Sequence, residues 1–151
     1  MESKYELMIK QMKSLAESSN NYIPVLSNVS ALIYDGLDNL NWAGFYLVKD
    51  GNLLLGPFQG KVACVNIEKG KGVCGTAYAL DETQLVDNVH EFPGHIACDS
   101  ASNSEIVIPI HHNNKVAGVL DIDSPLLNRF TNEDKSGLEK LVEELEKIIQ
   151  W

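Results

Sequence analysis

The side chain best placed for chemistry is Cys98, which lies in a short polar stretch between Phe92 and Glu105. Pro93-Gly94 is typical of a turn, and the Asp, Ser and Asn residues after the cysteine are typical of irregular backbone. Functional side chains are often carried by loops that a scaffold holds in place. A cysteine that serves only packing lies more often inside an apolar run. We therefore expect the Cys98 thiol to be accessible.

Two further cysteines, Cys64 and Cys74, bring the number of thiols to three. An odd number does not form a disulfide framework, and no Cys-x-x-Cys spacing supports a structural zinc site despite His90 and His95. Cys74 falls at the start of a predicted short helix, where free backbone N–H groups favour a thiolate. The alternative is that all three cysteines are buried and act as small apolar side chains.

A pair of acids, Asp121 and Asp123, lies at one end of an apolar segment. The two residues are two apart on a predicted strand, so both carboxylates project from the same face. A solvated strand face would carry polar residues along its whole length. Two carboxylates side by side at the rim of a core repel each other, and one of them tends to stay protonated.

Glu105 joins these acids only if the pairing of two neighbouring strands, residues 105–111 and 116–123, is irregular. A strict two-residue turn at Asn113-Asn114 pairs residue 106 with residue 121 and puts Glu105 on the opposite face. A one-residue bulge would turn Glu105 to the same face as the two aspartates, and Pro109 is the expected place for it. We predict the bulge, and with it a pocket lined by three carboxyl groups.

An aromatic face is predicted on the strand of residues 41–48. Alternation places Trp42, Gly44 and Tyr46 on one side, and both aromatic side chains carry a polar atom. This face could floor a pocket in which the glycine leaves room for a ligand. The alternative is a second buried face with no role in binding.

These residues suggest one joint chemistry. Clustered carboxylates attract a cation such as an ammonium group, which Trp42 and Tyr46 could cover. A protonated carboxyl could deliver a proton while a cysteine sulfur attacks a substrate. A cysteine oxidised to sulfenic acid could then be closed into a disulfide by a second cysteine and reopened by a cellular dithiol.

The elements that must position these groups follow from the hydrophobic pattern. Helices are predicted at residues 3–17, 24–36, 73–80 and 131–150. Strands are predicted at residues 41–48, 53–55, 61–67, 84–86, 105–111 and 116–123. Terminal helices around short, hairpin-linked strands indicate an α+β fold with an antiparallel sheet of about six strands. A chain of 151 residues suits one domain spanning residues 1–151.

Composition excludes several classes of partner. The formal net charge of −9 argues against nucleic acid and against anionic membrane surfaces, because both select basic patches. No apolar run is long enough to span a bilayer, and the charged N-terminus lacks the apolar core of a signal peptide. The sequence therefore predicts a cytoplasmic protein, in a compartment that keeps thiols reduced.

Six motifs between residues 41 and 125 include all three cysteines. They are Asn41-Trp-Ala-Gly-Phe-Tyr, Gly56-Pro-Phe-Gln-Gly-Lys followed by Cys64, Gly70-Lys-Gly-Val-Cys-Gly-Thr-Ala77, Phe92-Pro-Gly-His-Ile-Ala-Cys-Asp, Ser104-Glu-Ile-Val and Gly118-Val-Leu-Asp-Ile-Asp-Ser124. In this order they resemble the free methionine-(R)-sulfoxide reductases, which are single-domain enzymes of the GAF fold. The resemblance implies a GAF-like domain that reduces free L-methionine (R)-sulfoxide to L-methionine.

The resemblance also implies roles for the cysteines. Cys98 matches the cysteine that attacks the sulfoxide sulfur, and Cys64 and Cys74 match the two candidates for the resolving cysteine. Thioredoxin, or another dithiol, is the implied electron donor, with no bound cofactor and no metal. The family is commonly dimeric, which implies a homodimer.

For the substrate pocket, the resemblance implies two groups of residues. The acids Glu105, Asp121 and Asp123 match those that bind the amino group or supply the proton, and Trp42 and Tyr46 match pocket residues around the sulfoxide. How the substrate carboxylate is bound does not follow from the sequence, because a site this acidic would need backbone N–H groups for it.

Two other functions fit the same fold. One is a sensory module that binds a small ligand without chemistry, and the other is a thiol redox sensor in which Cys98 reports peroxide. A sensor is normally joined to an output domain and does not need three cysteines, so the sequence favours the enzyme.

Overall fold

A six-stranded antiparallel sheet, in the order β3-β2-β1-β6-β5-β4, forms the centre of the molecule. The computed structural model describes residues 3–95 and 101–151. The strands are β1 (Trp42–Lys49), β2 (Asn52–Gly60), β3 (Asn66–Ile67), β4 (Gln84–Val86), β5 (Ser104–His112) and β6 (Lys115–Ser124). The predicted α+β fold with six strands is confirmed, and β1, β6 and β5 lie at its centre.

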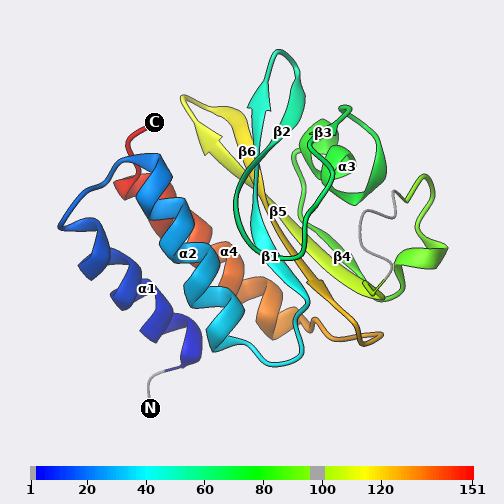
Figure 1. Ribbon diagram of the computed structural model, residues 1–151, viewed down its shortest axis with the longest axis horizontal. Coiled ribbons are helices and arrows are strands. Elements are labelled where there is room, and N and C mark those ends of the chain that lie inside the picture. The colour runs from blue at the N-terminus through cyan, green and yellow to red at the C-terminus, as the bar shows by residue number, and fades with distance from the viewer. Residues whose placement is uncertain (1–2, 96–100) are drawn as a thin grey trace.

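Three helices cover one face of this sheet: α1 (Lys4–Ala16), α2 (Tyr22–Gly36) and α4 (Asn132–Ile148) (Figure 1). Capping boxes at Ser3 and Thr131 fix the starts of α1 and α4, because each cap side chain and its partner three residues on satisfy two backbone N–H groups. The apolar faces of α2 and α4 pack on Phe45, Ile106 and the other apolar residues on this side, and α1 packs on α2 and α4.

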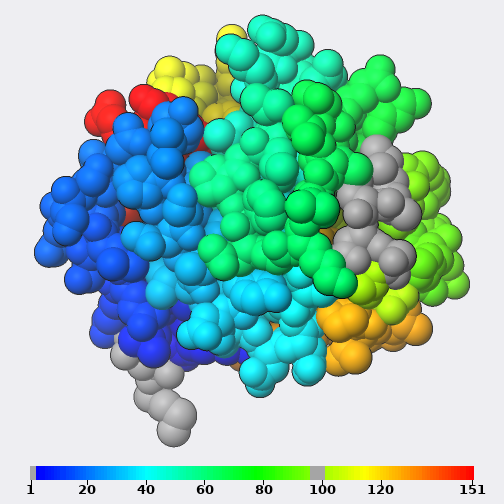
Figure 2. Space-filling model, in the orientation of Figure 1, coloured from blue at the N-terminus to red at the C-terminus, as the bar shows by residue number. Residues whose placement is uncertain are grey.

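The opposite face is covered by α3 (Gly72–Leu80) and by the chain around it (Figure 1). A single 3₁₀ turn, η1 (Val89–Glu91), follows β4. In the space-filling view, the segment between β2 and α3 lies over the central strands (Figure 2). Because side chains alternate along each strand, this face holds Trp42, Tyr46 and the acids, away from the helical core.

The predicted strands at residues 53–55 and 61–67 are wrong in their bounds. The first continues as β2 through Gly56-Pro57, which lie opposite Phe45 at a register shift in the pairing with β1. A bulge accommodates a proline because that position need not donate a ladder hydrogen bond. Only Asn66 and Ile67 of the second segment form a strand.

No helix among the residues that the structure describes is both long enough and apolar enough to cross a membrane.

Candidate active site

The pairing of β5 with β6 brings Glu105 to the acids. Glu105 lies opposite Asp123, and Val107 lies opposite Asp121, so all three carboxyl groups share one face. The predicted irregularity is confirmed, but Pro109 is the wrong place for it. Pro109 pairs regularly with Val119, and the register shifts one residue later, between Ile110 and His111.

The hairpin turn explains why a shift is needed. Asn113 and Asn114 both have positive φ, at 53° and 64°, which is the backbone of a tight two-residue turn. Such a turn pairs His112 with Lys115 and His111 with Val116. The next pair is Ile110 with Gly118, so Ala117 is the extra residue on β6. This single insertion decides which face Glu105 occupies.

Trp42 and Tyr46 lie beside the acids on β1, since Trp42 pairs with Asp123 and Tyr46 with Val119. Both are 3% exposed, and their rings stack with centroids 5.8 Å apart. The Trp42 Nε1 atom donates to the Lys61 carbonyl at 3.1 Å, and the Tyr46 hydroxyl donates to the Cys64 carbonyl at 2.9 Å. The two aromatic residues therefore also hold the segment that contains Cys64.

The expectation that Gly44 leaves room for a ligand is wrong. A Cβ atom at Gly44 would lie 2.3 Å from the Cβ of Phe58 and 2.9 Å from the Pro57 carbonyl oxygen. Phe58 fills this space and stacks on Trp42 with ring centroids 5.2 Å apart. The glycine therefore lets β2 approach β1 at the bulge.

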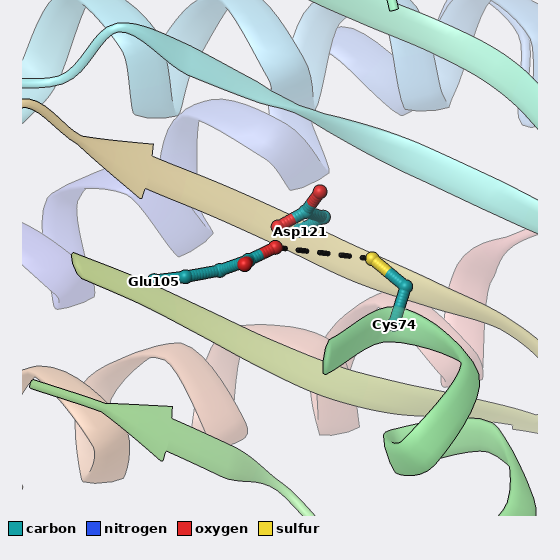
Figure 3. Close-up of side chains that lie close together, drawn as sticks. All are labelled: Cys74, Glu105 and Asp121. Carbon is teal, nitrogen blue, oxygen red and sulfur yellow. Dashed lines mark hydrogen bonds between the residues drawn. The ribbon is translucent and has the colours of Figure 1, made fainter. Parts of the chain in front are cut away.

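Cys74 lies in the first turn of α3 and faces the acids (Figure 3). Its Sγ atom is 4.0 Å from Oε2 of Glu105, and one donor atom each from Cys74, Glu105 and Asp121 lie within 4.8 Å of one another. All three residues are buried. Such a set of donor atoms could also hold a metal ion.

Burial favours the protonated forms of the thiol and carboxyl groups in this cluster. It raises the pKa of the Cys74 thiol well above its ordinary value, and the charges of Asp121 and Glu105 raise it further. The expected thiolate at the helix start is therefore wrong for this cysteine, because burial and negative charge outweigh the helix dipole.

Among the acids, Glu105 is the one that keeps its proton. Burial raises its pKa well above the ordinary value, and the charges of Asp121 and Asp123 add to the rise. Burial also raises the pKa of Asp121, but hydrogen bonding from Glu105 and Cys74 opposes that rise. Of the two, Glu105 is therefore the group that holds its proton more strongly, and Asp121 is the group that ionises first.

One cavity, of about 50 Å³, joins these groups. Its lining includes the predicted site residues Trp42, Tyr46, Cys74, Glu105, Asp121 and Asp123. Sequence reasoning did not select several other lining residues, among them Val62, Lys71, His95 and Ser102. Burial, followed by the nearby His90, lowers the pKa of His95 and so favours its neutral form. Lys71 was detectable only as a cation in the Gly-rich stretch before α3.

The cysteines differ in state. Cys64 is half-buried and is part of a disulfide, whereas Cys74 is a free thiol. The neighbours of Cys64, Val62 and Ala63, line the cavity. Cys98, the predicted nucleophile, lies outside the described residues.

Known proteins of similar sequence and fold indicate the family of this chain. A GAF domain family model matches residues 26–150. The free methionine-R-sulfoxide reductase of Escherichia coli (strain K12) is 52% identical over 145 residues, which cover 96% of this chain and 88% of that protein.

Two solved structures are also similar. The fRMsr of Staphylococcus aureus, in complex with substrate, is 53% identical, with a TM-score of 0.91 and coverage of 97% of this chain and 95% of that one. The free methionine-R-sulfoxide reductase from Neisseria meningitidis, in complex with its substrate, is 39% identical, with a TM-score of 0.90 and coverage of 95% and 86%.

Proposed function

This chain belongs to the GAF domain family and, within it, to the free methionine-R-sulfoxide reductases, and we propose from this premise that it reduces free L-methionine (R)-sulfoxide to L-methionine. The observation that carries the proposal is the meeting of Glu105, Asp121 and Asp123 with Trp42 and Tyr46 in one cavity. A free amino acid brings an ammonium group, which three buried carboxyl groups suit and which a peptide-bound methionine lacks.

The substrate side chain lies against the stacked rings of Trp42 and Tyr46, and its ammonium group binds Asp121 and Asp123. The start of α3 supports a place for the substrate carboxylate. Lys71 caps that helix without a side-chain hydrogen bond, and Lys71, Gly72 and Val73 line the same cavity. Free N–H groups of a first helical turn, together with a lysine, favour an anion.

The reduction begins with attack of the Cys98 sulfur on the sulfoxide sulfur. The neutral Glu105 gives a proton to the sulfoxide oxygen, which makes that oxygen easier to transfer. The oxygen moves to Cys98 as a sulfenic acid, and methionine leaves. The sulfur of methionine gains two electrons, and Cys98 loses two.

Cys64 then resolves the sulfenic acid, forming a disulfide with Cys98 and releasing water. The disulfide at Cys64 and the free, buried thiol of Cys74 support this choice between the two candidates. A thioredoxin dithiol reopens the bond and is itself oxidised to a disulfide, so no bound cofactor is needed. Val62 and Val65, which are 88% and 59% exposed, flank Cys64 and leave this segment accessible to a partner protein.

The test is turnover of the free R and S diastereomers with dithiothreitol and, separately, with a thioredoxin system. We expect reduction of the R form by the wild type and none by Cys98→Ser. Cys64→Ser should complete a single turnover and then recycle slowly with thioredoxin, whereas the exposed control Val65→Ser should match the wild type with dithiothreitol. Absence of turnover with either reductant would reject the enzyme and leave the sensory functions.

The remaining parts of the proposal are a single catalytic domain, a cytoplasmic location and a homodimer. Sedimentation of the purified protein tests the last of these, because a monomer at the enzyme concentrations of the assay would contradict it.

A further inference from the structure

Cys74 has no part in the proposed reduction, although it lies at the site. Its Sγ atom is buried against Glu105 Oε2 at 4.0 Å, and a free thiol held among carboxyl groups needs another explanation (Figure 3). The three residues come from three elements, α3, β5 and β6, so the sheet and the helix fix their relative positions. A donor set this well anchored can hold a small ligand without rearranging the fold.

A second observation comes from Asp121. The residue is 6% exposed, and its Oδ1 atom is buried without a hydrogen-bond partner among the described residues. Native structures rarely leave a buried carboxylate oxygen unsatisfied, because the desolvation cost has no compensation. The oxygen therefore marks a position where a positively charged ligand would be stabilised.

We propose that Cys74, Glu105 and Asp121 form a binding site for a borderline-soft divalent cation, best Zn²⁺. Zinc accepts thiolate and carboxylate ligands together, whereas calcium and magnesium select oxygen alone. In a tetrahedral zinc site the sulfur and oxygen ligands lie about 3.5 Å apart, given bonds of about 2.3 and 2.0 Å. The Cys74–Glu105 separation of 4.0 Å needs only a small contraction, and the cavity leaves a fourth position for water.

Charge also fits this site. With Cys74 and Glu105 protonated and Asp121 ionised, the three groups would carry one negative charge. A divalent cation bound by the three deprotonated groups leaves the same net charge. The exchange therefore buries no additional charge, which removes the main cost of an ion in an enclosed site.

Binding of the cation has a consequence for the reaction, and this part rests on the proposed function. The cation occupies Asp121, where the substrate ammonium is proposed to bind, and its binding displaces the Glu105 proton to solvent. Zinc should therefore inhibit the reductase competitively with free methionine sulfoxide, and a chelator should restore activity.

The direct test uses Co²⁺ as a spectroscopic probe of the reduced protein. The double variant Cys64→Ser/Cys98→Ser keeps Cys74 as its only cysteine, so any thiolate-to-cobalt charge-transfer band must come from that residue. We expect one equivalent of Co²⁺ to produce this band and Zn²⁺ to displace it. Adding Asp121→Asn should weaken cobalt binding at least tenfold, because a charged ligand is lost.

Two results would overturn the site: no thiolate band in the double variant, or a band whose affinity Asp121→Asn leaves unchanged. The exposed control Glu82→Gln in the same background should have no effect. The inhibition is tested on the wild type by the dependence of KM on Zn²⁺ concentration, and a KM that zinc leaves unchanged would refute it. If the wild type shows no turnover without added metal, the proposed reductase function is refuted. The cobalt spectra would still show whether Cys74, Glu105 and Asp121 bind a metal ion.

Discussion

At the level of single residues, the chemistry depends most on which carboxyl group of the site holds a proton. Because the pKa of Glu105 is raised more strongly than that of Asp121, the site has one group suited to donate a proton and one suited to hold a cation. The two roles are separated because hydrogen bonding from Glu105 and Cys74 opposes the effect of burial on Asp121.

Glu105→Gln tests the proton donor. Glutamine keeps the shape and the hydrogen-bonding capacity of a neutral carboxyl but cannot release a proton to the sulfoxide oxygen. We expect kcat with dithiothreitol to fall by about 10² to 10⁴-fold, the usual contribution of a general acid. Glu139→Gln, on the outer part of α4, is the matched control, and a kcat of Glu105→Gln near the wild-type value would show that another group supplies the proton.

The same residue predicts a dependence of stability on pH. The pKa of Glu105 is raised in the folded protein, so folding favours the protonated form and stability falls as pH rises toward and through the folded pKa. Glu105→Gln removes this loss, and the variant should therefore be more stable than the wild type at alkaline pH. Denaturant unfolding at several pH values measures it, and equal slopes for both proteins above neutral pH would contradict the prediction.

Helices and strands are easier to predict from hydrophobic periodicity than the bulges and turns that connect and align them. The stripes of α1, α2 and α4 were predictable because each helix buries one face, and the acidic strand because its two carboxylates are two residues apart. An irregularity in the β5–β6 pairing was predictable, because Glu105 reaches the face of the acids only with one. Its position at Ala117 was not predictable, because nothing in the local sequence distinguishes that residue. Proline misled twice, since Pro57 lies inside a strand and Pro109 pairs regularly.

The candidate site shows the same division. Alternation placed Trp42 and Tyr46 on the face of the acids, whereas the burial of Cys74 depends on how α3 lies on the sheet, which no local pattern encodes. Lys71 was missed for the same reason, because a lysine between two glycines usually points to solvent.

Gly44→Ala tests the close approach of β1 and β2. The added Cβ would lie 2.3 Å from Phe58 Cβ and 2.9 Å from a backbone oxygen, so the strands must move apart. We expect the free energy of unfolding to fall by about 1–3 kcal/mol, the usual cost of overpacking, and the Trp42–Phe58 stack to loosen. Chemical denaturation and tryptophan fluorescence measure both effects.

A second variant separates this clash from a general effect of substitution in β1. Phe58→Gly alone should also destabilise the protein, and adding Gly44→Ala should cost less in that background than in the wild type, because one of the clashing atoms is gone. Additive effects would mean that the contact with Phe58 does not limit the strand separation.

At the scale of the whole molecule, the sheet separates two apolar cores and His111 bridges them at its edge. Its Nδ1 atom lies 2.8 Å from Glu146 of α4, and its Nε2 atom lies 2.6 Å from Asp81 at the end of α3. The two helices cover opposite faces of the sheet. Because β4 begins at Gln84, opposite Val107, it does not extend alongside His111, and His111 can reach both helices.

This bridge predicts a second pH dependence with its own window. Burial lowers the pKa of His111, but hydrogen bonds to Asp81 and Glu146 raise it more, and the net direction is upward. The bridge therefore stabilises the fold fully below the ordinary histidine pKa of about 6.5 and is lost as pH rises through the folded value. Since the pair is partly exposed, solvent screening should limit the effect to under about 1 kcal/mol.

The measurement should use the Glu105→Gln background, because the contribution of Glu105 is also lost as pH rises and would overlap with that of His111. In that background, stability should decline through neutral pH, and His111→Gln should remove the decline. His112→Gln, one residue along the strand, is the control and should leave the decline in place. If the decline persists in His111→Gln, a charged histidine does not link α3 to α4 across the sheet. In that case α3, which carries Cys74, is held to the sheet by its apolar contacts alone.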